Sequence, residues 1–572
     1  MDRTPKKDKK ARALRIWACA LWAVAFPSLA APTPPVRNYT PAEYGADAQN
    51  WSVLEDGRGV VYIANSDGVL EFDGNDWRLI EIAGGAFALG SDAEGRVYVG
   101  GQGELGYLEP HGNGGMRFAS LLGDMPPEYR SFADRVVSIE VTPAGTVFFA
   151  DGLAFIWNRG RVEVVEASEH FFSSARVGDV LYAIDSRLGL VRIEDGGLAP
   201  VEGGELLRSR ALLPHGDGGL LAVHAEKGGI VYDPAERGRA AFGALLPPGD
   251  ALLQGGEVAC ATAVDGGFAV GTIRHGLVVA GADGAPAWRL GPEEGLQHAD
   301  VNGIHRDRRG NLWLALNSGV AYVEVDTAAA DSPFVAYIRL AEGVYDDSLI
   351  FAGAYYEAPD GLQQLRQPAH QRPEFPFDYN ALRFTFSSNE YRTPQAVEYR
   401  VVLEGLELDE RQAIWSNRVY REYTNLHPGD YTLRVQARSA RGDSSLAAHY
   451  AFSIAPPWFE SLWFTLSQVG FIVSLLVWAT LLDRRGRSIG FADNLIIFAV
   501  IVVFEYMFYE IEPVIGYYSD GIAFFQILVV AIMAFVLLPV DRMVINVIHR
   551  INAGHKARLA AEREAKDAEG GG

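Results

Sequence analysis

The residues best suited to chemistry in this chain are polar and aromatic side chains that recur, about once per repeat, beside short apolar strands in its N-terminal half. Amide, hydroxyl, carboxylate and guanidinium groups next to aromatic rings suit a sugar or another polar ligand, because hydrogen bonds orient the ligand and a ring supports its flat face. The alternative is that each merely solvates the end of a strand. The candidate ligand-binding residues are Asn50, Trp51, Phe132, Arg135, Ser174, Arg210, Glu257 and Asp300.

The sequence carries no catalytic or metal-binding motif. It contains no His-x-x-x-His, no paired-carboxylate motif and no cysteine cluster, and four histidines (His224, His275, His298 and His305) fall in different repeats. Their spacing leaves a metal site open, but scattered histidines are more often structural. We therefore expect no catalytic residues, no metal, no cofactor and no enzymatic activity.

A short glycine-punctuated unit, repeated seven times between Trp51 and Tyr322, must position the candidate residues. In each unit a glycine turn leads to an apolar or aromatic strand, and a second glycine turn follows about ten residues later, as in tight hairpins. The spacing is close to the ~40–45 residues of a four-stranded propeller blade. We predict a seven-bladed β-propeller over residues 40–330; a β-sandwich or irregular hairpins are the alternative. An aromatic residue three positions after the first glycine is expected to wedge between blades, as Tyr62, Tyr98, Phe148 and Trp313.

The pattern of the sequence changes after the predicted propeller. Glycine turns become rarer over residues 333–456, and stretches such as 382–387 and 431–437 alternate between apolar and polar residues at period two. Turn signals at Pro428-Gly429-Asp430 and Arg441-Gly442-Asp443 separate such stretches. This pattern predicts a β-sandwich, immunoglobulin-like in architecture.

These two regions resemble a known family of sensor proteins. The ring units resemble two-component regulator propeller repeats, best in residues 295–320, and the sandwich resembles the three-tyrosine (triple tyrosine motif) domain that follows such propellers. The resemblance implies a sensor that binds an extracellular ligand, often a carbohydrate, and signals across a membrane; it also implies a homodimer. The family often carries about fourteen repeats, whereas this chain has seven. The motif residues, expected in the sandwich core, are Tyr399, Trp415, Tyr423 and Tyr431.

Hydrophobic segments at both ends of the chain indicate export and a membrane. Residues 1–31 have the order of a signal peptide, with an uncleaved anchor as the alternative. Three charge-poor stretches, residues 461–482, 491–511 and 521–540, predict transmembrane helices, and the arginines that follow the first and third place those ends in the cytoplasm. Residues 541–572 form a short cytoplasmic tail. The predicted fold class is therefore mainly β with three C-terminal transmembrane α-helices, in the bacterial inner membrane with a large periplasmic N-terminal domain.

Glu505 interrupts the second of these stretches. A carboxylate within a membrane span is costly unless it is paired or close to water, so it is often functional. We predict that Glu505 couples movement of the exported part to the tail or to a partner's helix; solvation near the interface is the alternative.

The overall charge and the short C-terminal tail narrow the choice of partners. A net charge of −22 argues against nucleic acid, because no basic face is left to neutralise phosphates. The tail holds no kinase or cyclase, so a separate cytoplasmic or membrane protein (a kinase, cyclase or phosphatase) would supply the output. We predict a membrane-anchored ligand-binding receptor. The alternatives are an exported scaffold for envelope assembly, or the sensor half of a truncated histidine kinase or diguanylate cyclase.

Overall fold

The structure is a computed structural model of the whole chain. It describes residues 33–484, apart from short internal gaps, and scattered residues between 494 and 565. The chain divides into two compact units, Met1–Ile454 and Ala455–Gly572, which are described separately below. The predicted signal peptide (residues 1–31) lies outside the described residues. The internal gaps are 112, 195, 217, 225–227, 234–240, 245–256, 326–333, 354–355, 358–362, 365–366, 369–370 and 407–412.

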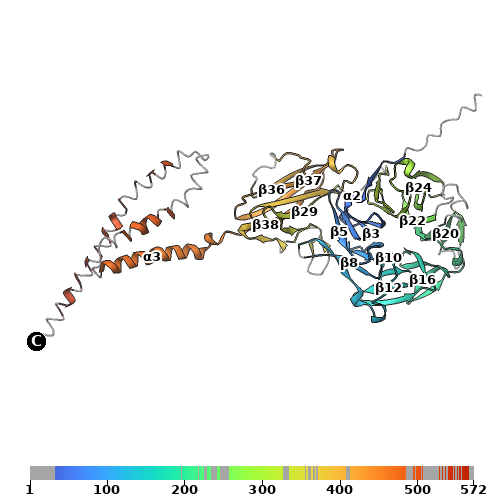
Figure 1. Cartoon of the computed structure of the whole chain (residues 1–572), viewed down its shortest axis with the longest axis horizontal. Coiled ribbons are helices and arrows are strands. Elements are labelled where there is room, and N and C mark those ends of the chain that lie inside the picture. Colours follow the sequence, from blue (N-terminus) through green and yellow to red (C-terminus); the bar gives the residue numbers. More distant parts are fainter. Residues whose placement is uncertain are drawn as a thin grey trace, which may run out of the picture. The chain divides into compact units, whose positions relative to one another are not determined.

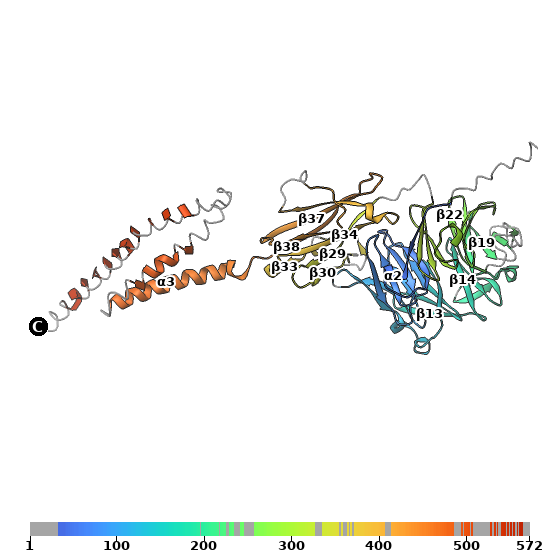
Figure 2. The same cartoon turned by 45° about the horizontal axis from the view of Figure 1, so that its top comes forward.

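Seven four-stranded antiparallel sheets follow one another in the described part of the first unit and form a ring (Figures 1 and 2). The innermost strand of each sheet contacts the innermost strand of the next, and the last contacts the first. The predicted propeller is thus confirmed. The first four blades are β2 (Asn50–Glu55), β3 (Val61–Asn65), β4 (Gly68–Phe72), β5 (Trp77–Glu81); β6 (Ala88–Ser91), β7 (Val97–Gly100), β8 (Leu105–Pro110), β9 (Met116–Ser120); β10 (Val136–Thr142), β11 (Gly145–Ala150), β12 (Leu153–Asn158), β13 (Arg161–Glu166); and β14 (Phe171–Val177), β15 (Val180–Asp185), β16 (Gly189–Glu194), β17 (Gly197–Pro200). The fifth and sixth are β18 (Ala211–His215), β19 (Gly219–His224), β20 (Gly228–Asp233), β21 (Ala241–Ala244); and β22 (Glu257–Val264), β23 (Gly267–Ile273), β24 (Gly276–Gly281), β25 (Pro286–Leu290).

The seventh blade is built from both ends of the ring. It consists of β26 (Val301–Arg306), β27 (Leu312–Leu316), β28 (Val320–Val323) and the N-terminal strand β1 (Val36–Tyr39), which pairs antiparallel with β28. The short helix α2 (Pro41–Tyr44) follows β1. This pairing joins the first strand of the chain to the last blade, so the ring has no open end.

Aromatic residues wedge between the blades, as the repeat pattern predicts. Tyr62 is fully buried in one cluster with Val97 and Val99 of the following blade. The ring of Phe148 lies 6.1 Å from that of Tyr98 in the preceding blade, and the ring of Trp313 lies 6.1 Å from that of Phe72 in the first blade. Large buried aromatic side chains therefore pack between neighbouring blades and bury apolar surface that a lone sheet would leave exposed.

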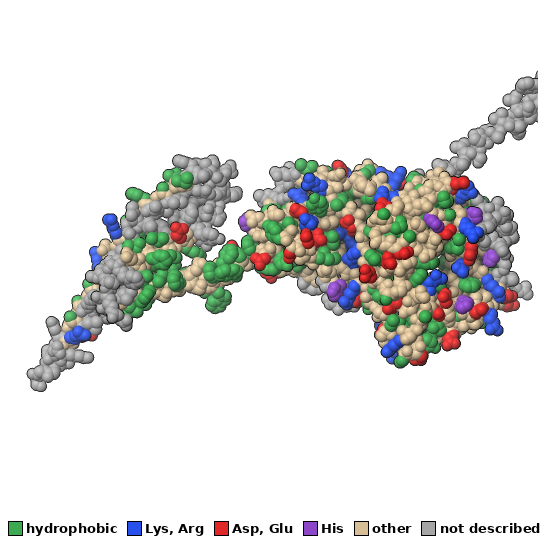
Figure 3. Space-filling model, in the orientation of Figure 1, with side chains coloured by type: hydrophobic (Ala, Val, Ile, Leu, Met, Phe, Trp, Pro, Cys, Tyr) green, Lys and Arg blue, Asp and Glu red, His purple; other side chains and the backbone are tan. Residues whose placement is uncertain are grey.

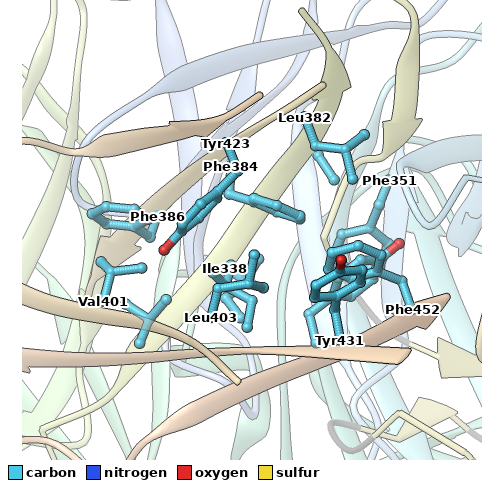
Figure 4. Close-up of a cluster of buried hydrophobic side chains, with 14 of the residues drawn as sticks. Ile338, Phe351, Leu382, Phe384, Phe386, Val401, Leu403, Tyr423, Tyr431 and Phe452 are labelled. Atoms are coloured by element: carbon cyan, nitrogen blue, oxygen red, sulfur yellow. The ribbon is translucent and has the colours of Figure 1, made fainter. Parts of the chain in front are cut away.

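Two four-stranded sheets follow the ring and share one hydrophobic core (Figure 4). Tyr399, Tyr423 and Tyr431 are buried in this core, as predicted. The Tyr431 hydroxyl donates to the carbonyl of His427, 2.7 Å away and four residues earlier, which is the arrangement of a tyrosine corner. The sheets are β30 (Leu349–Phe351), β29 (Ala336–Gly343), β34 (Leu382–Ser388), β36 (Tyr420–Tyr423); and β33 (Glu374–Phe375), β38 (Ala448–Ile454), β37 (Gly429–Arg438), β35 (Glu398–Glu404), with a small hairpin β31 (Tyr356–Glu357) and β32 (Gln363–Gln364).

The prediction that Trp415 lies in this core is wrong. Its ring is half-buried, and the guanidinium carbons of Arg400 and Arg438 lie 5.2 Å and 4.6 Å from the ring centre. The two arginines stand on neighbouring strands and cover the ring by cation–π contact. Trp415 therefore packs on the outside of the sandwich, between charged side chains.

The second unit contains α3 (Leu462–Arg484), which exposes large apolar side chains such as Trp463 and Phe471 (Figure 3). Among the described residues, no helix has both the length and the apolarity that crossing a membrane requires. The prediction of three transmembrane helices at 461–482, 491–511 and 521–540 is therefore wrong, and the inner-membrane, multi-pass location deduced from them is wrong with it. That prediction rested on missing charges, on length and on the arginines that follow, and it gave no weight to the polar residues Thr465, Ser467 and Gln468 of the first stretch. Most of residues 485–526 and much of the predicted tail lie outside the described residues.

Candidate functional site in the propeller channel

A cavity of about 720 Å³ runs along the axis of the propeller. It is lined by the innermost strands of all seven blades (β2, β6, β10, β14, β18, β22 and β26) and by residues just before them. Its volume lies within the range of small-molecule binding sites. Each blade therefore contributes side chains to one shared space.

A recurrent irregularity in the innermost strands turns extra side chains toward this cavity. In five blades the pairing register of the innermost strand shifts within its first three residues, which is the signature of a β-bulge. A bulge inserts one additional residue and re-aims its side chain, and bulges are frequent beside binding sites. The residues skipped by the register all line the cavity: Trp51, Val137, Phe172, Ala259 and Asn302.

Arginine and aromatic residues stack at one end of the channel. The guanidinium carbon of Arg135 lies 5.2 Å from the ring centre of Trp51 and 5.3 Å from that of Phe87, and these two rings are 5.1 Å apart. A second arginine, Arg210, lies 6.0 Å from the ring of Phe172. We call this end of the cavity the channel mouth. Its flat rings and in-plane guanidinium donors suit a ligand that offers both a ring face and acceptor groups.

Hydroxyl groups and a carboxyl group form a hydrogen-bonded chain deeper in the channel. Ser174 donates to the Glu140 carboxyl oxygen at 3.0 Å, and the Ser138 hydroxyl lies 2.9 Å from that of Ser174. Burial raises the pKa of Glu140, an effect that the Ser174 hydrogen bond and the Arg176 charge oppose in part. The channel wall therefore offers hydroxyl groups and a carboxyl group, and burial shifts this carboxyl group toward its neutral form.

His305 contributes a neutral imidazole to the wall of the channel. Its Nε2 atom accepts a hydrogen bond from the backbone N–H of Glu55 at 3.1 Å. Burial, aided by the Arg308 charge, lowers the pKa of His305 to about 4. The ring therefore carries its proton on Nδ1 and stays uncharged near neutral pH.

Four of the eight residues predicted to bind a ligand line this cavity: Trp51, Arg135, Ser174 and Arg210. The others have different surroundings. Asn50 is fully buried, where its amide donates to the carbonyl of Gly319 at 2.9 Å and so ties blade one to blade seven. Phe132 packs with its ring centre 5.0 Å from that of Phe155.

The two predicted carboxylates also lie away from the lining. Asp300 accepts the backbone N–H of Arg274 at 2.8 Å, and Glu257 forms an exposed ion pair with Arg210 at 3.4 Å. Both sit one or two residues before the bulge of their strand, so a shift of one position decides which side chain faces the axis.

Several lining residues were not anticipated from the sequence: Phe87, Glu140, His170, Phe172, Asn302 and His305. His305 did stand in the best repeat copy and could have been found by placing that repeat on the innermost strand. The bulge that exposes Phe172 and Asn302 leaves no separate signal in the sequence. Among the residues that the structure describes, no cluster of three or more histidine, cysteine or carboxylate side chains could hold a metal ion.

Glu505 lies in the second unit and borders a cavity of about 520 Å³ there. Ser467 and Gln468 of α3 line the same cavity. The coupling role predicted for Glu505 stays a prediction, because residues 507–526 beyond it lie outside the described residues.

Comparison with known proteins identifies one domain. Residues 390–455 match the model of the Y_Y_Y domain, which confirms the three-tyrosine resemblance for this part of the sandwich. No curated protein matches the chain.

Solved structures similar to the chain include propellers of several kinds. The extracellular domain of the putative hybrid two component system BT4673 from B. thetaiotaomicron is 13% identical, with a TM-score of 0.41, over 74% of this chain and 60% of that one. The corresponding domain of BT3049 is 14% identical, with a TM-score of 0.41, over 74% and 58%. The WD40 propeller domain of Doa1 is 11% identical, with a TM-score of 0.41, over 52% and 97%. This chain thus spans about 60% of the length of the BT4673 domain.

Proposed function

We propose that the protein is a ligand-binding sensor, whose propeller channel holds a polar small molecule or a carbohydrate and whose occupancy is relayed to a separate output protein. The observation that carries this proposal is the channel itself. All seven blades line it, and its walls combine aromatic rings with hydroxyl, imidazole and guanidinium groups. Such a mixture of flat surfaces and directional polar groups is typical of sites for polar ligands. The three-tyrosine domain at residues 390–455 fits a sensor role.

The join between propeller and sandwich supports a mechanical relay. Arg339 of β29 is buried, and its Nε donates to the carboxylate of Asp73, beside the first blade, at 2.7 Å. A second bond runs from the hydroxyl of Tyr391 to the carbonyl of Gly59 in the first blade. Because these contacts are buried and directional, a ligand that shifts the first blade would carry the sandwich with it.

A ligand screen tests the first half of the proposal. The full-length protein is heated with members of a panel of neutral and acidic oligosaccharides, amino acids and nucleosides, and the shift of the melting temperature is recorded. A ligand of the channel should no longer shift the melting temperature of Trp51→Ala, which loses the aromatic ring that would contact the ligand. It should also fail to shift that of Ser138→Leu, in which a larger side chain fills the cavity. The matched control is Trp458→Ala, because Trp458 is exposed and lies in the second unit. If no compound distinguishes the channel variants from the control, the channel is not a binding site.

Crosslinking in the native cell tests the second half. Affinity purification of the full-length protein, followed by mass spectrometry, should recover a kinase, a cyclase or a phosphatase. Recovery of envelope or secretion components alone would contradict the sensor proposal and favour a scaffold. The same preparation tests the expected homodimer through self-crosslinks between identical peptides.

A further inference from the structure

We propose that Arg135 binds an oxyanion, either a carboxylate or a sulfate group, carried by the ligand of the propeller channel. The inference rests on the proposed function and narrows it, since it excludes purely neutral sugars as the best ligands. It starts from the unusual surroundings of a single arginine in the channel mouth.

The Arg135 guanidinium contacts two aromatic rings but has no anionic partner among the described residues. It lies over the rings of Trp51 and Phe87, and it makes no ion pair or side-chain hydrogen bond with any residue that the structure describes. Other enclosed arginines are paired: Arg58 with Asp56 at 2.7 Å, and Arg339 with Asp73 at 2.7 Å. A cation–π contact restrains a guanidinium without using its N–H donors, and its planar fork of donors binds carboxylate and sulfate oxygens in pairs.

The charges around the channel mouth favour an anionic ligand group beside Arg135 over a neutral or cationic one. The neighbouring arginine of the mouth, Arg210, is already paired with Glu257, so Arg135 is the cation left for a ligand there. Of the two carboxyl groups in the lining, Glu140 accepts a hydrogen bond from Ser174 and is biased toward its neutral form by burial. Asp151 is the other. We therefore expect Asp151 to weaken the binding of an anion and thus to limit its affinity.

Matched monosaccharides test this inference on the full-length protein. Glucose, glucuronate and glucose 6-sulfate share a ring and differ in charge, and their affinities are measured by isothermal titration calorimetry at constant ionic strength. Glucuronate, glucose 6-sulfate or both should bind about ten-fold or more tightly than glucose, because a charge-assisted bidentate contact is added. The probe that binds more tightly identifies the source of the oxyanion as a carboxylate or a sulfate ester.

Arginine variants locate the effect. Arg135→Gln should reduce the affinity for the anionic probe to that for glucose, whereas Arg135→Lys should fall between, since it keeps the charge and loses the fork. Asp151→Asn should tighten binding of the anion. The matched control is Arg117→Gln, on the outer strand β9, where the exposed Arg117 pairs with Glu109 at 2.7 Å; this variant should bind like the natural protein.

The results separate this inference from the proposed function. If a neutral ligand binds in the channel and depends on Trp51, but neither anionic probe binds more tightly than glucose, the sensor proposal stands and the assignment to Arg135 is wrong. Equal loss of anion binding in Arg135→Gln and Arg117→Gln also overturns it, since general charge screening would then explain the effect. If no probe binds at all, the assignment is wrong whatever the outcome of the wider ligand screen.

Discussion

The Nε2 atom of His305, in the wall of the propeller channel, accepts a hydrogen bond from the backbone N–H of Glu55 at 3.1 Å. The Glu55 carboxylate in turn accepts the backbone N–H of Arg308 at 2.8 Å. Blades one and seven are thus joined by a histidine and a carboxylate whose pKa values move in opposite directions. The same turn of blade one receives the Tyr337 hydroxyl of the sandwich on the carbonyl of Arg58.

Stability should depend on pH through His305. Its pKa falls from an ordinary 6.5 to about 4, chiefly because it is buried. The folded state therefore binds fewer protons than the unfolded state between these values, so the contribution of His305 is complete above pH 6.5 and is lost as the pH falls toward 4. His305→Gln can still accept the Glu55 bond but does not titrate. The advantage of the natural protein over this variant should shrink by about 1–3 kcal/mol between pH 6.5 and pH 4, measured by urea unfolding; a constant difference would show that His305 is not buried neutral.

Glu55 should give the stability a pH dependence opposite to that of His305. Burial raises its pKa from 4.5 to about 7, against the opposing Arg308 backbone bond. The folded state then holds the proton longer than the unfolded state, so its contribution to stability is complete below pH 4.5 and is lost as the pH rises to 7. Glu55→Gln should become more stable relative to the natural protein, by about 1–3 kcal/mol, as the pH rises through this window. Urea unfolding of both proteins at pH 4.5, 5.5 and 7 would check this. A difference in the free energy of unfolding that does not change with pH would contradict it.

Removing Arg339 should be among the most damaging single changes. Its guanidinium contacts both Glu71 and Asp73, and it also donates to the carbonyl of Gly353 at 2.7 Å. Arg339→Met would remove the guanidinium from the buried Asp73 carboxylate and would leave Glu71 with Arg78 at 3.7 Å, at a cost of about 3–5 kcal/mol. Arg117→Met, at an exposed pair, should cost less than about 1 kcal/mol. Urea unfolding of both variants is the measurement, and similar losses would mean that the join contributes little.

Two glycines of the propeller should differ sharply in their tolerance of a side chain. Gly68 has φ +146°, and a Cβ there would lie 2.2 Å from the carbonyl oxygen of Ile80 in the adjacent strand. Gly178 has φ +59°, and a Cβ would meet nothing within 4 Å. Gly68→Ala should therefore cost about 3 kcal/mol or more, because backbone must move, whereas Gly178→Ala should cost about 1 kcal/mol of conformational strain. Equal melting temperatures for the two variants would contradict this reasoning.

The propeller could be predicted from the sequence because its signal is repeated. Each of the seven units carries the same glycine turns and the same aromatic wedge, so errors in any one unit do not change the result. The wedge residues Tyr62 and Trp313 are fully buried, as their spacing implies. Three tyrosines of the sandwich were placed in its core for a related reason: they fall on the apolar face of alternating strands.

The candidate site was predicted only in part, because its residues depend on single-residue offsets. Trp51 and Arg135 face the channel, whereas Asn50 is turned into the join between blades one and seven. Neighbouring side chains on a strand point to opposite faces, and a bulge reverses the order from its position onward. No feature of the sequence marks where that reversal occurs.

Charge and hydrophobicity were weaker guides at the C-terminal end. The stretch at 461–482 lacks charges and predicts a membrane span, yet no described helix meets both requirements for one. What the sequence alone determined is the number of blades, the order of propeller and sandwich, and the core tyrosines, because periodicity encodes them locally. Only the tertiary structure decided which residues meet in the channel, that Arg135 has no ion pair among the described residues and that Arg339 ties the sandwich to the first blade, because these contacts join residues far apart in the chain.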